Sequence, residues 1–127
     1  AEALAEYTHE LVRQEWGYQK DITSNKLDLI REKYQGIRPA PGYPACPDHS
    51  EKRTIFSILD IKNQSNMRLT ENCAIWPAAS VAGIYFSSPE SRYFSTGKID
   101  RNQLASYAMR KKITNEEAER WLAPNLT

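Results

Sequence analysis

Hydrophobic residues recur every three to four positions at the start of the chain, the spacing that places them on one face of an α-helix. The pattern predicts an amphipathic helix over residues 1–16 that ends near Gly17. Six residues share one face of this helix: Leu4, Thr8, Leu11, Val12, Glu15 and Trp16. Because most charged residues fall on other faces, this face is the one expected to pack against the domain.

The same period predicts two more helices before the middle of the chain. Four residues are candidate N-caps: Thr23 and Ser24 for the second helix, Asp48 and Ser50 for the third. Their expected packing faces are Leu27, Ile30 and Tyr34 in the second helix, and Ile55, Ile58, Leu59 and Lys62 in the third. The second helix should end at Gly36, and the third in the polar turn 63–66.

Beyond residue 67 the pattern shifts to the two-residue period of a β-strand. Residues 81–86 alternate in this way and predict one strand, and residues 92–99 predict a second. The polar segment 87–91 should connect them, so the two strands are expected to pair as an antiparallel hairpin. A short strand within 69–75 is a weaker prediction.

Two helices with recognisable N-terminal capping residues are predicted at the end of the chain. Asp100 with Gln103, and Thr114 with Glu117, have the spacing of a capping box. The expected buried faces are Leu104, Tyr107 and Ala108 in the first helix, and Ala118, Trp121 and Leu122 in the second, which Pro124 closes. A single α+β domain, with helices packed around an antiparallel β-hairpin, accounts for this order of elements.

Four prolines lie within Arg38–Pro47, a segment called here the proline rail. Each proline fixes its own φ and keeps the preceding residue extended, so the rail is stiff without being a helix. Arg38 could bind a carboxylate or phosphate, Gly42 permits close approach, and Tyr43 offers a stacking face. Two interpretations remain open on composition alone: a ligand cradle, or a rigid linker.

The charge and amino-acid composition of the chain make several classes of function unexpected. The net charge of +1 over 127 residues, with no long run of one sign, gives no reason to expect a nucleic acid or an anionic membrane as partner. We expect a cytoplasmic protein whose two cysteines, Cys46 and Cys73, are free thiols. With only two histidines and five scattered glycines, a multi-histidine metal site and a glycine-rich phosphate loop are not expected.

The residues 38–52, RPAPGYPACPDHSEK, resemble the signature of the activation (reactivation) domain of cobalamin-dependent methionine synthase. The likeness continues in six further segments: LTE at 69–71, WPAASVAG at 76–83, YF at 85–86, RYF at 92–94, GKI at 97–99 and ERWLAPNL at 119–126. It therefore extends over essentially the whole chain, residues 1–127, which resemble the C-terminal portion of that longer domain.

The resemblance implies that the chain binds S-adenosylmethionine, whose methyl group re-forms active cobalamin from inactive cob(II)alamin. Arg38 would pair with the ligand carboxylate, Ala40 would contribute backbone contacts, and Gly42 and Tyr43 would shape the pocket. Tyr93 and Phe94 match an aromatic pair of the family, of which only Tyr93 carries a hydroxyl here. Two acidic residues, Glu2 and Glu32, also fall where the family has acids near the ligand.

The resemblance also implies an enzymatic context, as part of a 5-methyltetrahydrofolate–homocysteine methyltransferase in methionine biosynthesis. Cobalamin and zinc would belong to other domains of that enzyme. The expected partners are its cobalamin-binding domain and a flavodoxin or related flavoprotein. An alternative is a docking module for either partner without catalysis of its own. It is motivated by five cations that are expected to be exposed: Lys52, Arg53, Arg110, Lys111 and Lys112.

Overall fold

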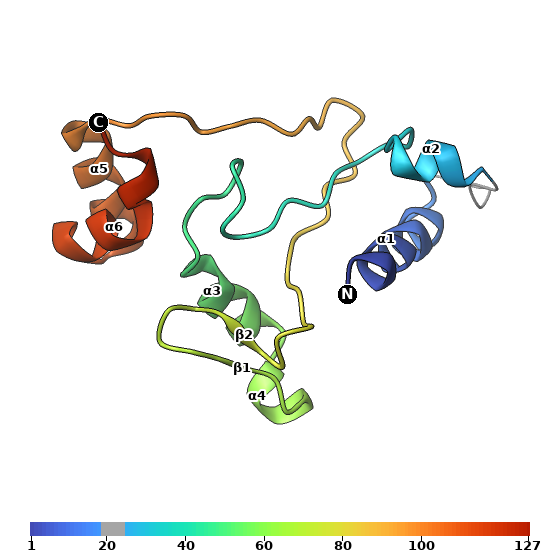
Figure 1. Cartoon of the computed structure of the whole chain (residues 1–127), viewed down its shortest axis with the longest axis horizontal. Helices are drawn as coiled ribbons and strands as arrows, with labels where there is room; N and C mark the ends of the chain where they lie inside the picture. The colour runs from blue at the N-terminus through green and yellow to red at the C-terminus, as the bar shows by residue number, and fades with distance from the viewer. Residues whose placement is uncertain (19–24) are drawn as a thin grey trace.

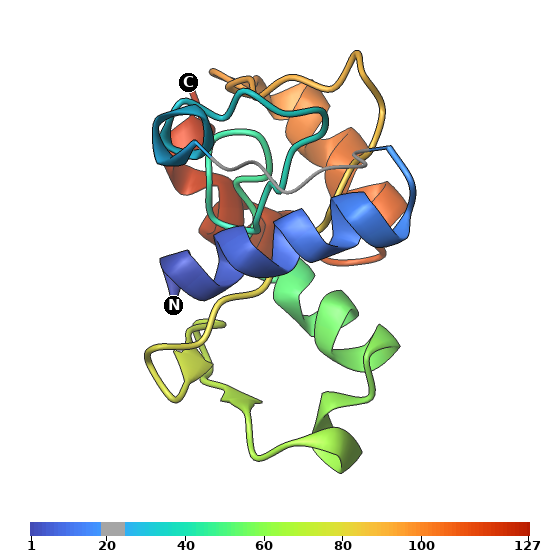
Figure 2. The same cartoon turned by 90° about the vertical axis from the view of Figure 1, so that its right-hand side faces the viewer.

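The computed structural model describes residues 1–18 and 25–127. Figure 1 shows three groups of elements joined by long extended segments. Helices α1 (Glu2–Glu15) and α2 (Lys26–Ile30) form one group, and α5 (Arg101–Lys111) and α6 (Asn115–Leu122) form another on the opposite side. The third group contains the remaining helices and the sheet, and the view in Figure 2 shows it projecting from the other two.

Helix α1 has the predicted bounds but buries a different face. His9, Glu10 and Arg13 are buried, whereas Leu4 is 67% exposed and Trp16 57% exposed. The predicted packing face was therefore wrong. Amphipathic spacing assumes an apolar neighbour, but the neighbours of α1 are tyrosine rings and the charged side chain at the start of the proline rail, so its polar side packs inward.

Helix α2 is shorter than predicted. Asn25 caps it by accepting a hydrogen bond from the Leu27 N–H, while Thr23 and Ser24 lie outside the described residues. The helix stops at Ile30, because Glu32 takes a left-handed conformation at φ 49° and turns the chain. The predicted end at Gly36 was therefore wrong, and Tyr34 lies beyond the helix, free to point at other elements.

The predicted third helix is two helices, α3 (Glu51–Ile58) and α4 (Ile61–Gln64). Asp60, left-handed at φ 49°, separates them, so a single face running to Lys62 was wrong. Asp48 accepts a hydrogen bond from the Ser50 N–H, but the Ser50 side chain makes no cap bond.

The predicted hairpin of residues 81–99 was also wrong. The sheet is instead formed by β1 (Arg68–Leu69) and β2 (Ile75–Trp76), which pair antiparallel in the region of the weaker strand prediction. The segments 81–86 and 92–99 do not pair with each other, because both bond to the rail region. Phe86 forms a bridge with Ile37, and the Thr96 N–H donates to the Pro44 carbonyl at 2.9 Å.

The two C-terminal helices match their prediction closely. Asp100 and Gln103 complete a capping box on α5, and Thr114 caps α6 by accepting from the Glu117 N–H. A hydrophobic core cluster lies between the two helices and includes Leu104, Ala108, Ala118 and Leu122. Trp121 is also buried. A short 3-10 helix, Ala123–Asn125, contains Pro124 and closes the chain as expected.

Over residues 1–18 and 25–127, then, α-helices and a small antiparallel sheet make up the structure, and the predicted α+β class is confirmed. Both cysteines are free thiols, as predicted. Within the same residues, none of the helices has the length and apolar character needed to cross a membrane.

Candidate functional site

The candidate site is built on the backbone of the proline rail, which runs through the middle of Figure 1. The rail folds back on itself, because the Gly42 N–H donates to the Cys46 carbonyl at 2.7 Å and the Cys46 N–H donates to Tyr43 at 2.9 Å. Gly42 has φ 101°, and a Cβ there would lie 2.2 Å from Cε1 of His49. This turn therefore requires glycine for both conformation and space.

Arg38 lies at the start of the rail with its guanidinium held by side chains from two other segments. Glu6 Oε2 lies 2.7 Å from Arg38 Nη2, and Tyr34 Oη lies 2.7 Å from Nη1. His9 Nδ1 is 3.4 Å from Nη1, and Glu32 Oε1 is 4.0 Å from Nη2. The cation is thus oriented by acids and neutral acceptors on α1 and on the segment after α2.

A cluster of aromatic rings around the buried His9 packs against Arg38. His9 is fully buried, stacked on Tyr85 at 4.8 Å between ring centroids and edge-on to Tyr34 at 5.3 Å. Burial, together with the charges of Arg13 and Arg38, lowers the pKa of His9 to about 4. His9 is therefore neutral at pH 7 and can accept a hydrogen bond from Arg38.

Tyr93 also contacts Arg38, through the backbone of the arginine rather than its side chain. Its hydroxyl accepts a hydrogen bond from the Arg38 N–H at 2.9 Å, although the two residues are 55 positions apart. The neighbouring Phe94 is 62% exposed, so its ring is available to solvent rather than packed in a core. The structure thus brings two of the predicted site residues, Tyr93 and Arg38, into contact.

The middle of the rail presents backbone groups and one exposed ring. The Ala40 carbonyl accepts from the Tyr43 N–H at 3.2 Å, and the Tyr43 ring is 61% exposed. Gly83 packs closely here, since a Cβ on it would lie 3.0 Å from the Pro39 carbonyl oxygen. Such close packing fixes the rail against the segment 81–86.

The acidic residues are only partly those that the sequence suggested. Glu32 lies at the edge of the Arg38 cluster, whereas Glu2 is an exposed residue in the first turn of α1. The acid in direct contact with Arg38 is Glu6, which sequence reasoning did not select. One signal could have found it, because Glu6 lies one helical turn after Glu2 and so shares its face.

A second polar cluster lies at the other end of the rail. Lys111 Nζ contacts Asp48 at 2.6 Å and Glu51 at 2.5 Å, and Tyr107 donates to Asp48 at 2.5 Å. Burial raises the pKa of Asp48, but hydrogen bonds from Lys111, Tyr107 and Ser50 outweigh burial and place the pKa below its ordinary value. The expectation that Lys111 is an exposed cation was therefore wrong.

A cavity of about 790 Å³ adjoins this second cluster rather than Arg38. Its walls come from the end of the rail, including Cys46 and Asp48, and from α5, including Gln103 and Ser106. We prefer the Arg38 region to this cavity as the ligand site, because several polar side chains hold the Arg38 guanidinium in a defined orientation. Among the residues described, no group of three or more histidine, cysteine, aspartate or glutamate side chains is placed to hold a metal ion.

Comparison with known proteins places these features in a family. The model of the family described as "Vitamin B12 dependent methionine synthase, activation domain" matches residues 1–112. Among solved structures, the chain is similar to one described as the MetH reactivation domain bound to AdoHcy, with 55% identity and a TM-score of 0.94. That match covers 99% of this chain and 39% of the other, so this chain spans well under half the length of that structure.

The fold and the match define the chain as an activation domain of the kind found in vitamin B12-dependent enzymes. It belongs to the methionine synthase activation-domain family, and the resemblance identified in the sequence is confirmed. At this level of identity the solved structure also supports the arrangement of the elements around the rail.

Proposed function

We propose that this chain is the C-terminal portion of a methionine synthase activation domain and binds S-adenosylmethionine at the Arg38 site. The observation that carries the proposal is the environment of Arg38. Its guanidinium is held by Glu6 and Tyr34, and its backbone N–H donates a hydrogen bond to Tyr93. The solved structure that the chain resembles holds the related molecule AdoHcy, which has the same adenosine and amino-acid ends.

The chemistry of the ligand fits the charges of the site. The amino-acid end of S-adenosylmethionine carries a carboxylate, for which an arginine fork is a suitable partner. Its ammonium and sulfonium charges are favoured by nearby carboxylates, which Glu6 and Glu32 supply next to Arg38. We assign Glu2 a lesser role, since it lies exposed in the first turn of α1.

The adenosine end is assigned to the rail. Ala40 and the exposed Gly42 offer their backbones, while the exposed rings of Tyr43 and Phe94 can stack on a purine. Because the prolines fix the rail before the ligand arrives, little conformational entropy is lost on binding. The site is therefore preorganised by backbone stiffness as well as by charge.

In the parent enzyme, this binding would supply the methyl group for reactivation of the cobalamin. Cobalamin, bound by its own domain, would supply the cobalt centre for this transfer, which would take one electron from the flavoprotein and release S-adenosylhomocysteine. The residues of this chain bind and orient the sulfonium ligand. We place cobalamin and zinc in other domains of the parent, and homocysteine methylation is the activity of that whole enzyme.

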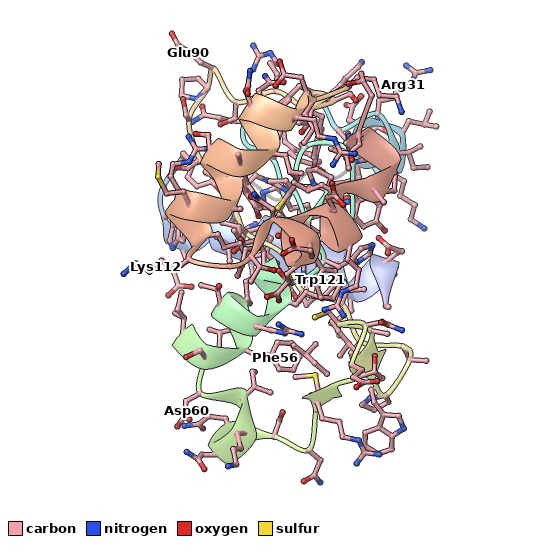
Figure 3. The ribbon with its side chains drawn as sticks, turned by 90° about the vertical axis from the view of Figure 1, so that its left-hand side faces the viewer. Arg31, Phe56, Asp60, Glu90, Lys112 and Trp121 are labelled. Atoms are coloured by element: carbon pink, nitrogen blue, oxygen red, sulfur yellow. The ribbon has the colours of Figure 1, made fainter. Side chains whose placement is uncertain are left out.

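The test is isothermal titration of S-adenosylmethionine into the full-length gene product that contains this chain. Replacing Arg38 with alanine should weaken binding at least thirtyfold, which corresponds to a loss of about 2 kcal/mol or more for a charged pair of this kind. Arg31→Ala is the matched control, because Arg31 is exposed and points away from the ribbon in Figure 3. Absence of binding, or equal affinity in wild type and Arg38→Ala, would refute the proposal.

A docking role is compatible with this binding function, and exposed cations favour it. Arg110 and Lys112 end α5 with exposed side chains, and Lys112 projects from the ribbon in Figure 3. We propose that they steer an acidic flavoprotein such as flavodoxin, with the cobalamin-binding domain as the second partner. Replacing both with glutamate should slow flavoprotein association at low salt and leave S-adenosylmethionine affinity unchanged; an unchanged association rate would contradict this role.

A further inference from the structure

Tyr34 contacts three residues of α1 as well as Arg38 itself. Its hydroxyl accepts a hydrogen bond from Arg38 Nη1 at 2.7 Å and donates to Glu6 Oε2 at 3.3 Å. Its ring stacks under the Arg13 guanidinium, with Cζ 3.7 Å from the ring centroid, and meets the edge of His9. Tyr34 thus links the Arg38–Glu6 ion pair to the cluster of aromatic rings around His9.

The two hydrogen bonds of the hydroxyl determine how the Arg38 fork is turned. Glu6 contacts Nη2 while Tyr34 contacts Nη1, so the two outer nitrogens of the fork are fixed from one side. Burial raises the pKa of Tyr34 to about 12 against the opposing charge and hydrogen bond of Arg38, so the phenol keeps its proton at pH 7. It can therefore donate to Glu6 and accept from Arg38 at the same time.

From this geometry we propose that Tyr34 is a positioning residue for recognition of the ligand carboxylate. It acts through Arg38, by holding the guanidinium in the orientation that an incoming carboxylate requires. The inference rests on the proposed function of the Arg38 site and adds a specificity residue to it. A freely rotating arginine would bind the same carboxylate less tightly, because the side chain would lose more conformational freedom on binding.

Tyr34→Phe isolates the hydroxyl from the rest of the side chain. The phenylalanine ring keeps the cation–π contact with Arg13 and the edge contact with His9, so the packing of α1 is preserved. Tyr7→Phe is a matched control, since Tyr7 lies on the same helix as Glu6 but is 57% exposed. Equal thermal unfolding midpoints of wild type, Tyr34→Phe and Tyr7→Phe would establish that folding is preserved.

The experiment is a double-mutant cycle in the full-length gene product, with affinity for S-adenosylmethionine measured by calorimetry or competition. Tyr34→Phe should weaken binding about tenfold in the wild-type background, as expected for a hydrogen bond to a charged group. In the Arg38→Ala background the same change should have less than a twofold effect. Decarboxylated S-adenosylmethionine, which lacks the carboxylate, should bind wild type and Tyr34→Phe equally.

The possible outcomes separate this inference from the proposed function. If Arg38→Ala abolishes binding and Tyr34→Phe binds like wild type, the Arg38 site stands and the positioning role of Tyr34 is refuted. Equal losses for Tyr34→Phe in both backgrounds would also refute it, since the effect would not pass through Arg38. If wild type itself shows no binding, the proposed function fails first.

Discussion

The two ends of the proline rail are both held by ionic contacts, but the contacts differ in what they leave available. At the Asp48 end, the carboxylate is 3% exposed and is engaged by a lysine, a tyrosine and a backbone N–H. At the Arg38 end, the arginine side chain is 20% exposed, and the side chains of its acidic partners Glu6 and Glu32 are 22% and 46% exposed. The first end is closed in the sense that the Asp48 carboxylate is buried, while its partner Lys111 is 19% exposed. The second end is open in the sense that none of these three charged side chains is buried.

This difference indicates that the two ends of the rail have different roles. The closed Asp48 end fixes the rail to α5 and α3, and so contributes to stability. The open Arg38 end is oriented but accessible, as a ligand site must be. Substitutions at the closed end should therefore change folding, and substitutions at the open end should change binding.

The largest effect expected on stability comes from breaking the closed end. Lys111→Met removes the cation that contacts Asp48 and Glu51 and leaves a buried carboxylate without its charged partner. The free energy of unfolding should fall by about 3 kcal/mol. Lys33→Met is the matched control: Lys33 pairs with Asp28 but is 58% exposed, so the loss should stay below about 1 kcal/mol.

Urea unfolding of both lysine variants measures the contrast directly. Similar losses for the two variants would show that the Asp48 cluster is no more important to the fold than a surface ion pair. S-adenosylmethionine affinity, corrected for any unfolded fraction, should be the same in Lys111→Met and wild type, because Lys111 lies at the end of the rail away from Arg38.

An effect of similar size distinguishes the two ends of the rail by their dependence on pH. The pKa of His9 is lowered to about 4 in the fold, against an ordinary value of 6.5, so the unfolded chain binds the proton first. Stability contributed by neutral His9 is complete above pH 6.5 and is lost as the pH falls toward 4, with a total of about 3 kcal/mol. Because the pKa of Asp48 is below its ordinary value of 3.8, its contribution is lost only at still lower pH.

Unfolding free energies at pH 7, 5.5 and 4 test this order. His9→Phe, which retains a ring to stack on Tyr85, should flatten the loss between pH 6.5 and 4. His49→Gln should retain most of it, since His49 is exposed. A wild-type protein that is equally stable at pH 7 and pH 4 would contradict the burial of neutral His9.

The smallest effect concerns the turn between the two ends. Gly42→Ala places a Cβ against His49 and forces φ 101° on an L-residue, with an expected cost of about 2 kcal/mol. Gly97→Ala is the control, because Gly97 also has a positive φ of 69° but no atom lies within 4 Å of the added Cβ. Its cost should be about 1 kcal/mol.

Thermal unfolding and S-adenosylmethionine titration of both glycine variants report on the turn. Gly42→Ala should also weaken ligand binding, since the rail would shift between Ala40 and Tyr43. If the two variants lose the same stability and neither loses affinity, the shape of the turn does not matter to the site.

The C-terminal helices show what local sequence information can decide. Asp100, Gln103 and Thr114 act within a single helical turn, so their capping roles follow from spacing alone. The buried faces of α5 and α6 were also predicted correctly, because these helices pack on each other and the apolar side of each has an apolar partner. Arg38 and Tyr93 were likewise selected from the sequence, through the family motif.

Other features depended on contacts between distant segments. The segments 81–86 and 92–99 alternate with the period of β-strands, but this period does not indicate which segment each one pairs with. Both form hydrogen bonds with the rail region rather than with each other. Helix α1 turns its polar side inward, because Tyr34, Tyr85 and Arg38 are its neighbours. The sequence of α1 alone does not predict that these residues are its neighbours.

The sequence by itself determined the α+β class, the helix caps at the end of the chain and the stiffness of the rail, and it selected Arg38 as a candidate ligand residue. The tertiary structure decided which acid faces that arginine, which tyrosine holds it, and why one end of the rail is closed and the other open. The physical reason is one of range: propensity, capping and proline geometry act over a few residues, whereas Glu6, Tyr34 and Tyr93 meet Arg38 only after the chain has folded.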